Sequence, residues 1–297
     1  MQNKKLIVIL GPTASGKSDL SVKLAKEFKG EIISADSRQV YKGMDIGTGK
    51  ITKKEMAGVP HHLLSVVEPK RKFTVTNYQN LAGKKINEIF KRNNIPFLVG
   101  GTGFYIQSIT EGIQIPQVKP DWRLRKKLNS FETEELFKML KKKDPQRARC
   151  IDRFNRHRLI RAMEIVIKTK KPIPLIKKEL PEFKMLMIGI KKSPAQLRKL
   201  IKERLMKRLK QGLIAEVKQL KKSGLSWKKL EDSGLEYKYV SQYLQNKIIR
   251  MEMIEKIQIG SEHYAKRQMT WFKRNKRINW VKNYREVKIL TRNFIYK

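Results

Sequence analysis

One glycine-rich loop near the N-terminus constrains the fold of this chain more than any other feature. The apolar run Leu6–Leu10 precedes it; five residues are too few for an independent helix but typical of a strand buried on both faces. Residues 11–18 match the phosphate-binding pattern GxxxxGK(S/T) at every specified position. Leu20, Leu24 and Phe28 then recur at helical spacing. Strand, loop and helix together indicate a phosphate site rather than an ordinary glycine turn.

The chemistry of this loop is that of a diphosphate or triphosphate site. Backbone N–H groups of the turn and of the helix N-terminus converge on phosphate oxygens. Lys17 adds a positive charge, and the Ser18 hydroxyl is a possible metal ligand for Mg2+. The expected phosphate-binding residues are Gly11, Pro12, Thr13, Ala14, Ser15, Gly16, Lys17 and Ser18.

A carboxylate follows the second predicted strand. Residues 31–35 have the apolar pattern of a strand, and Asp36 stands at its C-terminal end, the edge where parallel sheets bind ligands. We therefore expect Asp36 to face the phosphate site. A third buried strand, Pro96–Val99, ends in Gly100-Gly101-Thr102. Because NTP hydrolases usually carry an acidic residue at such a position, hydrolysis of ATP is not expected.

The charge balance points to a large anionic partner. The chain carries 68 Lys and Arg residues against 27 Asp and Glu residues, a formal net charge of +41. A small phosphorylated substrate does not require this excess, whereas nucleic acid attracts it through phosphate contacts that release counterions. A general lysine bias of the source proteome is the alternative explanation. Nucleic acid is the favoured partner.

Length and cysteine content bound the class of protein. The 297 residues can bury a substantial core in one large or two modest domains. Apolar runs are too short to span a bilayer, so no membrane partner is expected. The single cysteine, Cys150, excludes an internal disulfide and a cysteine-based zinc module. A reducing, cytoplasmic location is the resulting expectation. A monomer is expected as well, although no residue pattern determines the oligomeric state.

The middle of the chain has the pattern of a helical insertion. Pro116 and Pro120 interrupt the sheet pattern, and from Asp121 to about Lys178 the periodicity is helical and rich in Lys and Arg. The strand-like run Met185–Ile190 then returns the chain to the sheet. The expected fold class is α/β, a P-loop parallel sheet core flanked by helices (1–120 and 184–297) with an inserted all-helical lobe (121–183).

Helices are expected to dominate the C-terminal part. Ser193 as N-cap, Pro194 at the first helical position and Gln196 three residues after the cap predict a helix start. A long amphipathic segment, Met251 to about Arg274, interleaves aromatic and basic residues. Such a segment can stack on bases and hold phosphates. A core-facing aromatic stripe with a solvated basic face fits the periodicity equally well.

Seven segments, in order, resemble the tRNA dimethylallyltransferases, also called tRNA isopentenyltransferases. They are Gly11–Ser18, Asp36–Tyr41, Asp45–Thr48, Pro60–Leu63, Gly100–Gly103, Arg161–Glu164 and Ala265–Trp271. The resemblance implies transfer of a dimethylallyl group from dimethylallyl diphosphate to N6 of adenosine 37, just 3′ of the anticodon, in tRNAs that read codons starting with U. The products would be N6-isopentenyladenosine and diphosphate, with Mg2+ as cofactor.

The resemblance also implies roles for individual residues. Asp36 matches the general base, and Arg204 matches an arginine that binds the leaving group, with Lys17 and Thr102 as further catalytic residues. Leu200 departs from the family, many members of which have an arginine one turn before Arg204. The expected tRNA-binding residues are Asp36, Ser37, Arg38, Gln39, Thr102, Arg125, His157, Arg158, Arg161, Lys266, Arg267 and Gln268.

Two other functions fit part of the pattern. A small-molecule P-loop kinase would hold ATP in the loop and use Asp36 to deprotonate a hydroxyl, but it does not explain the net charge of +41. A non-catalytic RNA-binding protein explains the charge but not a carboxylate predicted beside an intact phosphate loop. Arg204 could also be an ordinary solvated helix residue.

Overall fold

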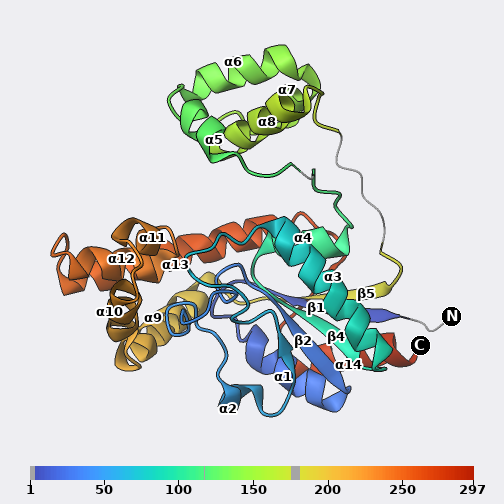
Figure 1. Cartoon of the computed structure of the whole chain (residues 1–297). Coiled ribbons are helices and arrows are strands. Elements are labelled where there is room, and N and C mark those ends of the chain that lie inside the picture. The colour runs from blue at the N-terminus through green and yellow to red at the C-terminus, as the bar shows by residue number, and fades with distance from the viewer. Residues whose placement is uncertain (1–3, 117, 175–180) are drawn as a thin grey trace. The chain divides into compact units, whose positions relative to one another are not determined.

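A parallel sheet carries the N-terminal loop at its carboxyl edge (Figure 1). The computed structural model describes residues 4–116, 118–174 and 181–297, and within them six strands lie in the order β3-β2-β4-β1-β5-β6. Every strand pair is parallel, and central β1 pairs with β4 on one side and β5 on the other. The strand bounds are β1 Lys5–Leu10, β2 Gly30–Ala35, β3 His61–His62, β4 Ile95–Gly100, β5 Lys184–Ile190 and β6 Ile278–Val281.

Both faces of the sheet are buried, because the central strands are apolar without interruption. In β1, Leu6, Val8 and Leu10 contribute to the core on one face. Ile7 and Ile9 contribute to the core on the other face, and none of these five side chains is exposed to solvent. Each buried apolar side chain of this size is worth about 1.5–3 kcal/mol, so the sheet is a rigid base for the loops at its edge.

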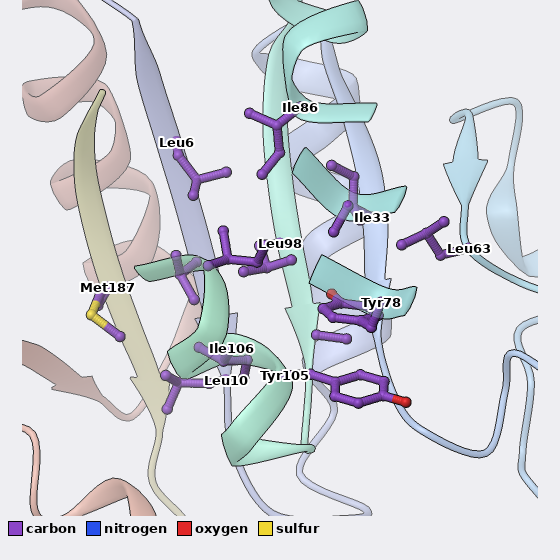
Figure 2. Close-up of a cluster of buried hydrophobic side chains, with 14 of the residues drawn as sticks. Leu6, Leu10, Ile33, Leu63, Tyr78, Ile86, Leu98, Tyr105, Ile106 and Met187 are labelled. Carbon is purple, nitrogen blue, oxygen red and sulfur yellow. The ribbon is translucent and has the colours of Figure 1, made fainter. Parts of the chain in front are cut away.

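Helices cover the two faces. α3 (Val75–Lys91) and α4 (Gly103–Thr110) pack on the first, and α1 (Lys17–Glu27) and α14 (Tyr284–Tyr296) pack on the second. Figure 2 shows the first layer, in which strand side chains meet side chains from the two helices: Leu6, Leu10, Ile33, Leu98, Met187, Tyr78, Ile86, Tyr105 and Ile106. The stacked rings of Tyr78 and Tyr105, with centroids 3.9 Å apart, join α3 to α4.

The segment between β5 and β6 is a helical block with a core of its own. Its helices are α9 Pro194–Lys210, α10 Leu213–Lys222, α11 Trp227–Glu231, α12 Leu235–Leu244 and α13 Arg250–Phe272. Leu205, Val217, Tyr237 and Met253 lie in this core, and Met44 from the loop after β2 packs into it. The block is therefore tied to the loop that follows Asp36, which also contains the short helix α2 (Lys53–Met56).

The chain divides into two compact units, residues 1–111 with 180–297 and residues 112–179. The second unit contains α5 (Trp122–Leu128), α6 (Thr133–Lys143), α7 (Pro145–Cys150) and α8 (Arg156–Thr169), which enclose a separate apolar core. The limits expected from the sequence, 121 and 183, lie a few residues after those of this unit. Among the residues that the structure describes, no helix is long and apolar enough to cross a membrane.

The observed elements confirm the predicted α/β class and correct several details. The capping box of Ser193 and Gln196 starts α9, as the sequence predicts. The helical pattern expected up to about residue 178 ends earlier, because Lys170 adopts a left-handed conformation (φ 52°) after α8; residues 175–178 lie outside the described ranges. The sequence pattern did not predict β3, β6 or α14.

Candidate active site

The loop between β1 and α1 presents polar groups that lack protein partners. Gly16 adopts a left-handed conformation (φ 84°) that a side chain would strain, and no side-chain hydrogen bond caps the first turn of α1. The Ser15 hydroxyl is buried and has no hydrogen-bond partner among the described residues. An anion at this helix N-terminus would satisfy these groups.

Lys17 brings positive charge into the loop at an energetic cost. Its Nζ donates a hydrogen bond to the Pro12 carbonyl at 3.0 Å. Burial and, secondarily, the positive charge of Arg204 lower its pKa to about 8, and the charge of Asp36 only partly opposes them. A bound diphosphate would supply the negative charge that this ammonium group needs.

Arg204 reaches the phosphate loop from α9. Its Nη1 donates to the Thr13 hydroxyl at 3.0 Å, so the residue is part of the site and not an ordinary solvated helix position. Burial and the nearby Arg208 guanidinium lower the pKa of Arg204 to about 10, which leaves it charged at pH 7. Both guanidinium groups lie against Gly49, where an added Cβ would come within 2.0 Å of an Nη2 atom of each.

Asp36 follows β2 directly and has one carboxylate oxygen engaged. Its Oδ1 accepts the backbone N–H groups of Arg38 at 2.8 Å and Gln39 at 3.3 Å. No hydrogen bond from the described residues reaches Oδ2. The charge of Asp36 acts on both Lys17 and Arg204, which places the carboxylate at the same edge of the sheet as the phosphate loop.

Thr102 joins the ends of two strands beside Asp36. Its backbone N–H donates to the Ala35 carbonyl at 3.1 Å, and its Oγ1 accepts the N–H of Ser37 at 3.0 Å. Thr102 also forms the N-cap of α4 without a side-chain capping bond. The residue therefore sets the path of the chain on both sides of Asp36.

A second glycine-rich turn, residues 45–49, is held by one carboxylate. Glu216 of α10 accepts the backbone N–H groups of Asp45, Ile46 and Gly47 at 2.7–3.0 Å and the Tyr237 hydroxyl at 2.8 Å. The Gly49 carbonyl then accepts hydrogen bonds from Gln39 at 3.2 Å and from Arg204 at 3.5 Å. The turn thus connects the helical block to the loop that carries Asp36.

The four residues of the second unit that were predicted to bind tRNA fall into two pairs in the structure. Arg125 and Arg161 both donate to the fully buried carboxylate of Glu164, Arg125 through Nη2 at 2.7 Å. These two guanidinium groups join α5 to α8. His157 and Arg158, in the first turn of α8, are exposed and remain candidates for contact with tRNA.

Comparison with known proteins identifies the family. A model described as "IPP transferase" matches residues 39–275, and one described as "Isopentenyl transferase" matches residues 4–67. The chain belongs to the IPP transferase family. A tRNA dimethylallyltransferase of Thermoanaerobacter sp. strain X514 is 42% identical over 299 residues, which cover 96% of this chain and 95% of the relative.

Solved structures of the same family share the fold. A full-length tRNA isopentenylpyrophosphate transferase from Bacillus halodurans matches with a TM-score of 0.73 and 37% identity, over 99% of this chain and 96% of the other. A eukaryotic dimethylallyltransferase described as acting on tRNA matches with a TM-score of 0.76 and 29% identity, over 90% of this chain and 69% of the other.

In this chain, α13 carries exposed basic residues and one buried amide. Lys266 and Arg267 are exposed, as the sequence prediction of tRNA contact requires. Gln268, predicted to contact tRNA as well, is instead only 6% exposed and hydrogen-bonds to the phosphate loop. Sequence reasoning missed Glu216, because its partners are backbone groups about 170 residues away.

Proposed function

We propose that this chain is a tRNA dimethylallyltransferase that modifies N6 of adenosine 37 with dimethylallyl diphosphate as donor. The proposal rests on two observations: the chain belongs to the IPP transferase family, and its phosphate loop lies beside a carboxylate. A phosphate loop with Lys17 and Arg204 meets the carboxylate of Asp36 at one edge of the sheet. The loop suits the diphosphate, and the carboxylate suits the amine.

The transfer step follows from these positions. The adenine N6 forms a bond to the first allylic carbon of the donor, while the bond from that carbon to the diphosphate oxygen breaks. The exocyclic amine is a weak nucleophile because its lone pair is delocalised into the ring, so Oδ2 of Asp36 accepts the N6 proton as positive charge develops. Lys17, Arg204 and the loop N–H groups stabilise the departing diphosphate.

Mg2+ fits this site as a companion of the diphosphate. Among the described residues, no group of three or more His, Cys, Asp or Glu side chains could hold a metal. The oxygen donors near the loop are the Ser18 hydroxyl and the Asp36 carboxylate, and Mg2+ is commonly held by one or two protein oxygens together with substrate phosphates. When bound, the ion would neutralise charge on the leaving group.

The remaining partners follow from the proposed substrates. One tRNA would bind through its anticodon stem-loop, with adenosine 37 extruded from the stack to reach Asp36. The exposed basic residues Arg158, Lys266 and Arg267 are the proposed phosphate contacts. We propose that the chain acts as a monomer in the cytoplasm, where the tRNA pool is located.

Mass spectrometry of tRNA nucleosides tests the proposal directly. Purified protein is incubated with an unmodified tRNA transcript, dimethylallyl diphosphate and Mg2+, and the digested RNA is searched for N6-isopentenyladenosine. A transcript with guanosine in place of adenosine 37 should give no product. Release of ADP from ATP with a small-molecule acceptor, without nucleoside product, would support the kinase alternative instead.

A further inference from the structure

We propose that Gln268 is a positioning residue that holds the phosphate loop in its diphosphate-binding shape. The proposal rests on the proposed transferase function and concerns a residue of α13 (Arg250–Phe272) that the sequence places among the tRNA contacts. Gln268 acts through Thr13 of the loop, and its own side chain touches neither substrate.

The side-chain amide of Gln268 connects the loop after β1 to the loop after β4. Its Oε1 accepts the backbone N–H of Thr13 at 2.8 Å, and its Nε2 donates to the Gly101 carbonyl at 2.9 Å. Gly101 follows β4, whereas Thr13 follows β1, so one amide group fixes the spacing of two neighbouring strand ends. The bond to Gly101 is buried and the bond to Thr13 is partly buried, and Gln268 itself is only 6% exposed.

Thr13 is the loop residue through which this bridge acts on the site. Its hydroxyl accepts a hydrogen bond from Nη1 of Arg204 at 3.0 Å. Fixing the Thr13 backbone therefore also fixes the position of a guanidinium group proposed to bind the leaving group. Without the bridge, the Thr13 N–H would be left unpaired in a partly buried loop.

Packing around the bridge supports the same role. Ala265, one turn before Gln268, is buried against Leu197 and Ile201 of α9, and Ala14 of the phosphate loop packs on this cluster. The buried face of α13 thus backs the loop by apolar contact and by hydrogen bonds. The adjacent residues Lys266 and Arg267 point to solvent.

Gly101 leaves the space that the amide of Gln268 occupies. An added Cβ at this position would lie 2.3 Å from Nε2 of Gln268, too close for any real contact. The end of a flexible side chain would yield before the backbone, so an alanine here would displace the amide of Gln268. This substitution disturbs the same bridge from its opposite end.

Separate binding measurements for the two substrates test the proposal. For Gln268→Met, which removes both hydrogen bonds at similar volume, we expect the Kd for inorganic diphosphate and the KM for dimethylallyl diphosphate to rise roughly tenfold. The Kd for tRNA should stay within about twofold of the wild type. Gln258→Met, on the same helix but with its side chain bonded to Glu262, is the matched control and should leave all three values unchanged.

Gly101→Ala provides a second variant in case Gln268→Met fails to fold, and it should show the same selective loss of diphosphate affinity. A tRNA Kd raised about tenfold with diphosphate affinity intact would make Gln268 a tRNA contact and overturn the proposal. Normal affinities for both ligands would overturn it as well. The Kd for diphosphate is measured without any transfer reaction. If the proposed transferase function were wrong, this binding result would still test the role of Gln268.

Discussion

At the scale of single residues, the site depends on charges placed where solvent cannot fully stabilise them. Lys17 and Arg204 are both held near the Asp36 carboxylate, and burial lowers the pKa of each. Such a site favours an anionic ligand because the ligand removes the cost of burying two cations. The lowered pKa of Lys17 in the free protein is therefore a measurable sign that the site prefers an anion.

The first prediction concerns pH. With the pKa of Lys17 at about 8, its charge is lost as the pH rises through that value, and we expect diphosphate affinity to fall by up to tenfold per pH unit above pH 8. Titration calorimetry between pH 7 and 9.5 measures this, with Lys17→Met as control. The same pH dependence in the control would assign it to another group.

The affinity for diphosphate and the free energy of unfolding should change in opposite directions as the pH rises, so the two effects can be separated. The pKa of Lys17 is lowered from 10.5 to about 8 in the folded chain, so the penalty for burying its charge disappears as the pH rises between these values. The contribution of this residue to the free energy of unfolding therefore increases over the range in which affinity decreases.

A second prediction concerns Asp36. Asparagine keeps an Oδ1 that can accept the N–H groups of Arg38 and Gln39, so Asp36→Asn should preserve the loop and bind both substrates nearly normally. Because the amide cannot accept the N6 proton, single-turnover transfer should slow by about 10²–10⁴-fold. Recovery of the rate at raised Mg2+ would instead make Asp36 chiefly a metal ligand.

At the scale of helices and strands, the sequence predicted those elements whose signal is local. Apolar runs predicted β1, β2, β4 and β5, and a capping box predicted the start of α9. The two-residue β3 and the strand β6, with Asn279 and Trp280 between its buried ends, have no such signal. Their pairing is decided by neighbouring strands.

The candidate site, too, could be predicted from the sequence only where its signal is local. The phosphate loop and Asp36 are recognisable because each lies next to its strand in the sequence. The bridge from Gln268 to Thr13 joins residues 255 positions apart, and no local pattern distinguishes it from a surface contact. The resemblance to a family predicted a tRNA contact for Gln268, and the structure shows that its side chain is buried and bonded to the phosphate loop.

A third prediction separates two arginines on α8. Arg158 is exposed, and Arg158→Ala should reduce the log–log salt slope of tRNA binding by about one without changing stability. Arg161 donates to the buried carboxylate of Glu164, which Arg125 also binds, so Arg161→Ala should cost about 1–3 kcal/mol of stability in this unit. Salt-dependent binding and thermal unfolding, measured on both variants, distinguish the two roles; equal salt slopes would contradict this division.

At the scale of the whole molecule, positive charge is distributed over both units. The net charge of +41 includes exposed runs such as Lys141–Lys143 at the end of α6, as well as Lys266 and Arg267 on α13. A field of this extent attracts a polyanion from a distance and is screened by salt. Attraction of tRNA is thus a property of the chain as a whole, whereas placing the reacting groups is local.

A fourth prediction concerns the unit of residues 112–179. It has its own apolar core, which includes Leu136, Leu140 and Leu159, and hydrogen bonds within it cap its helices. Expressed alone, this segment should give a helical circular dichroism spectrum and melt cooperatively. Leu140→Ala should lower its stability by about 2–5 kcal/mol. A random-coil spectrum would show that the unit needs the rest of the chain.

The position of β1 between β4 and β5 also governs events on the ribosome. Lys5 of β1 pairs with Lys184 of β5, so β1 leaves the ribosome long before its partner strand β5 is synthesised. At about 5–20 residues per second, translation takes on the order of ten seconds or more to reach it. During that interval the edge of β1 that later meets β5 lacks its partner, and an unpaired apolar strand edge is prone to aggregate.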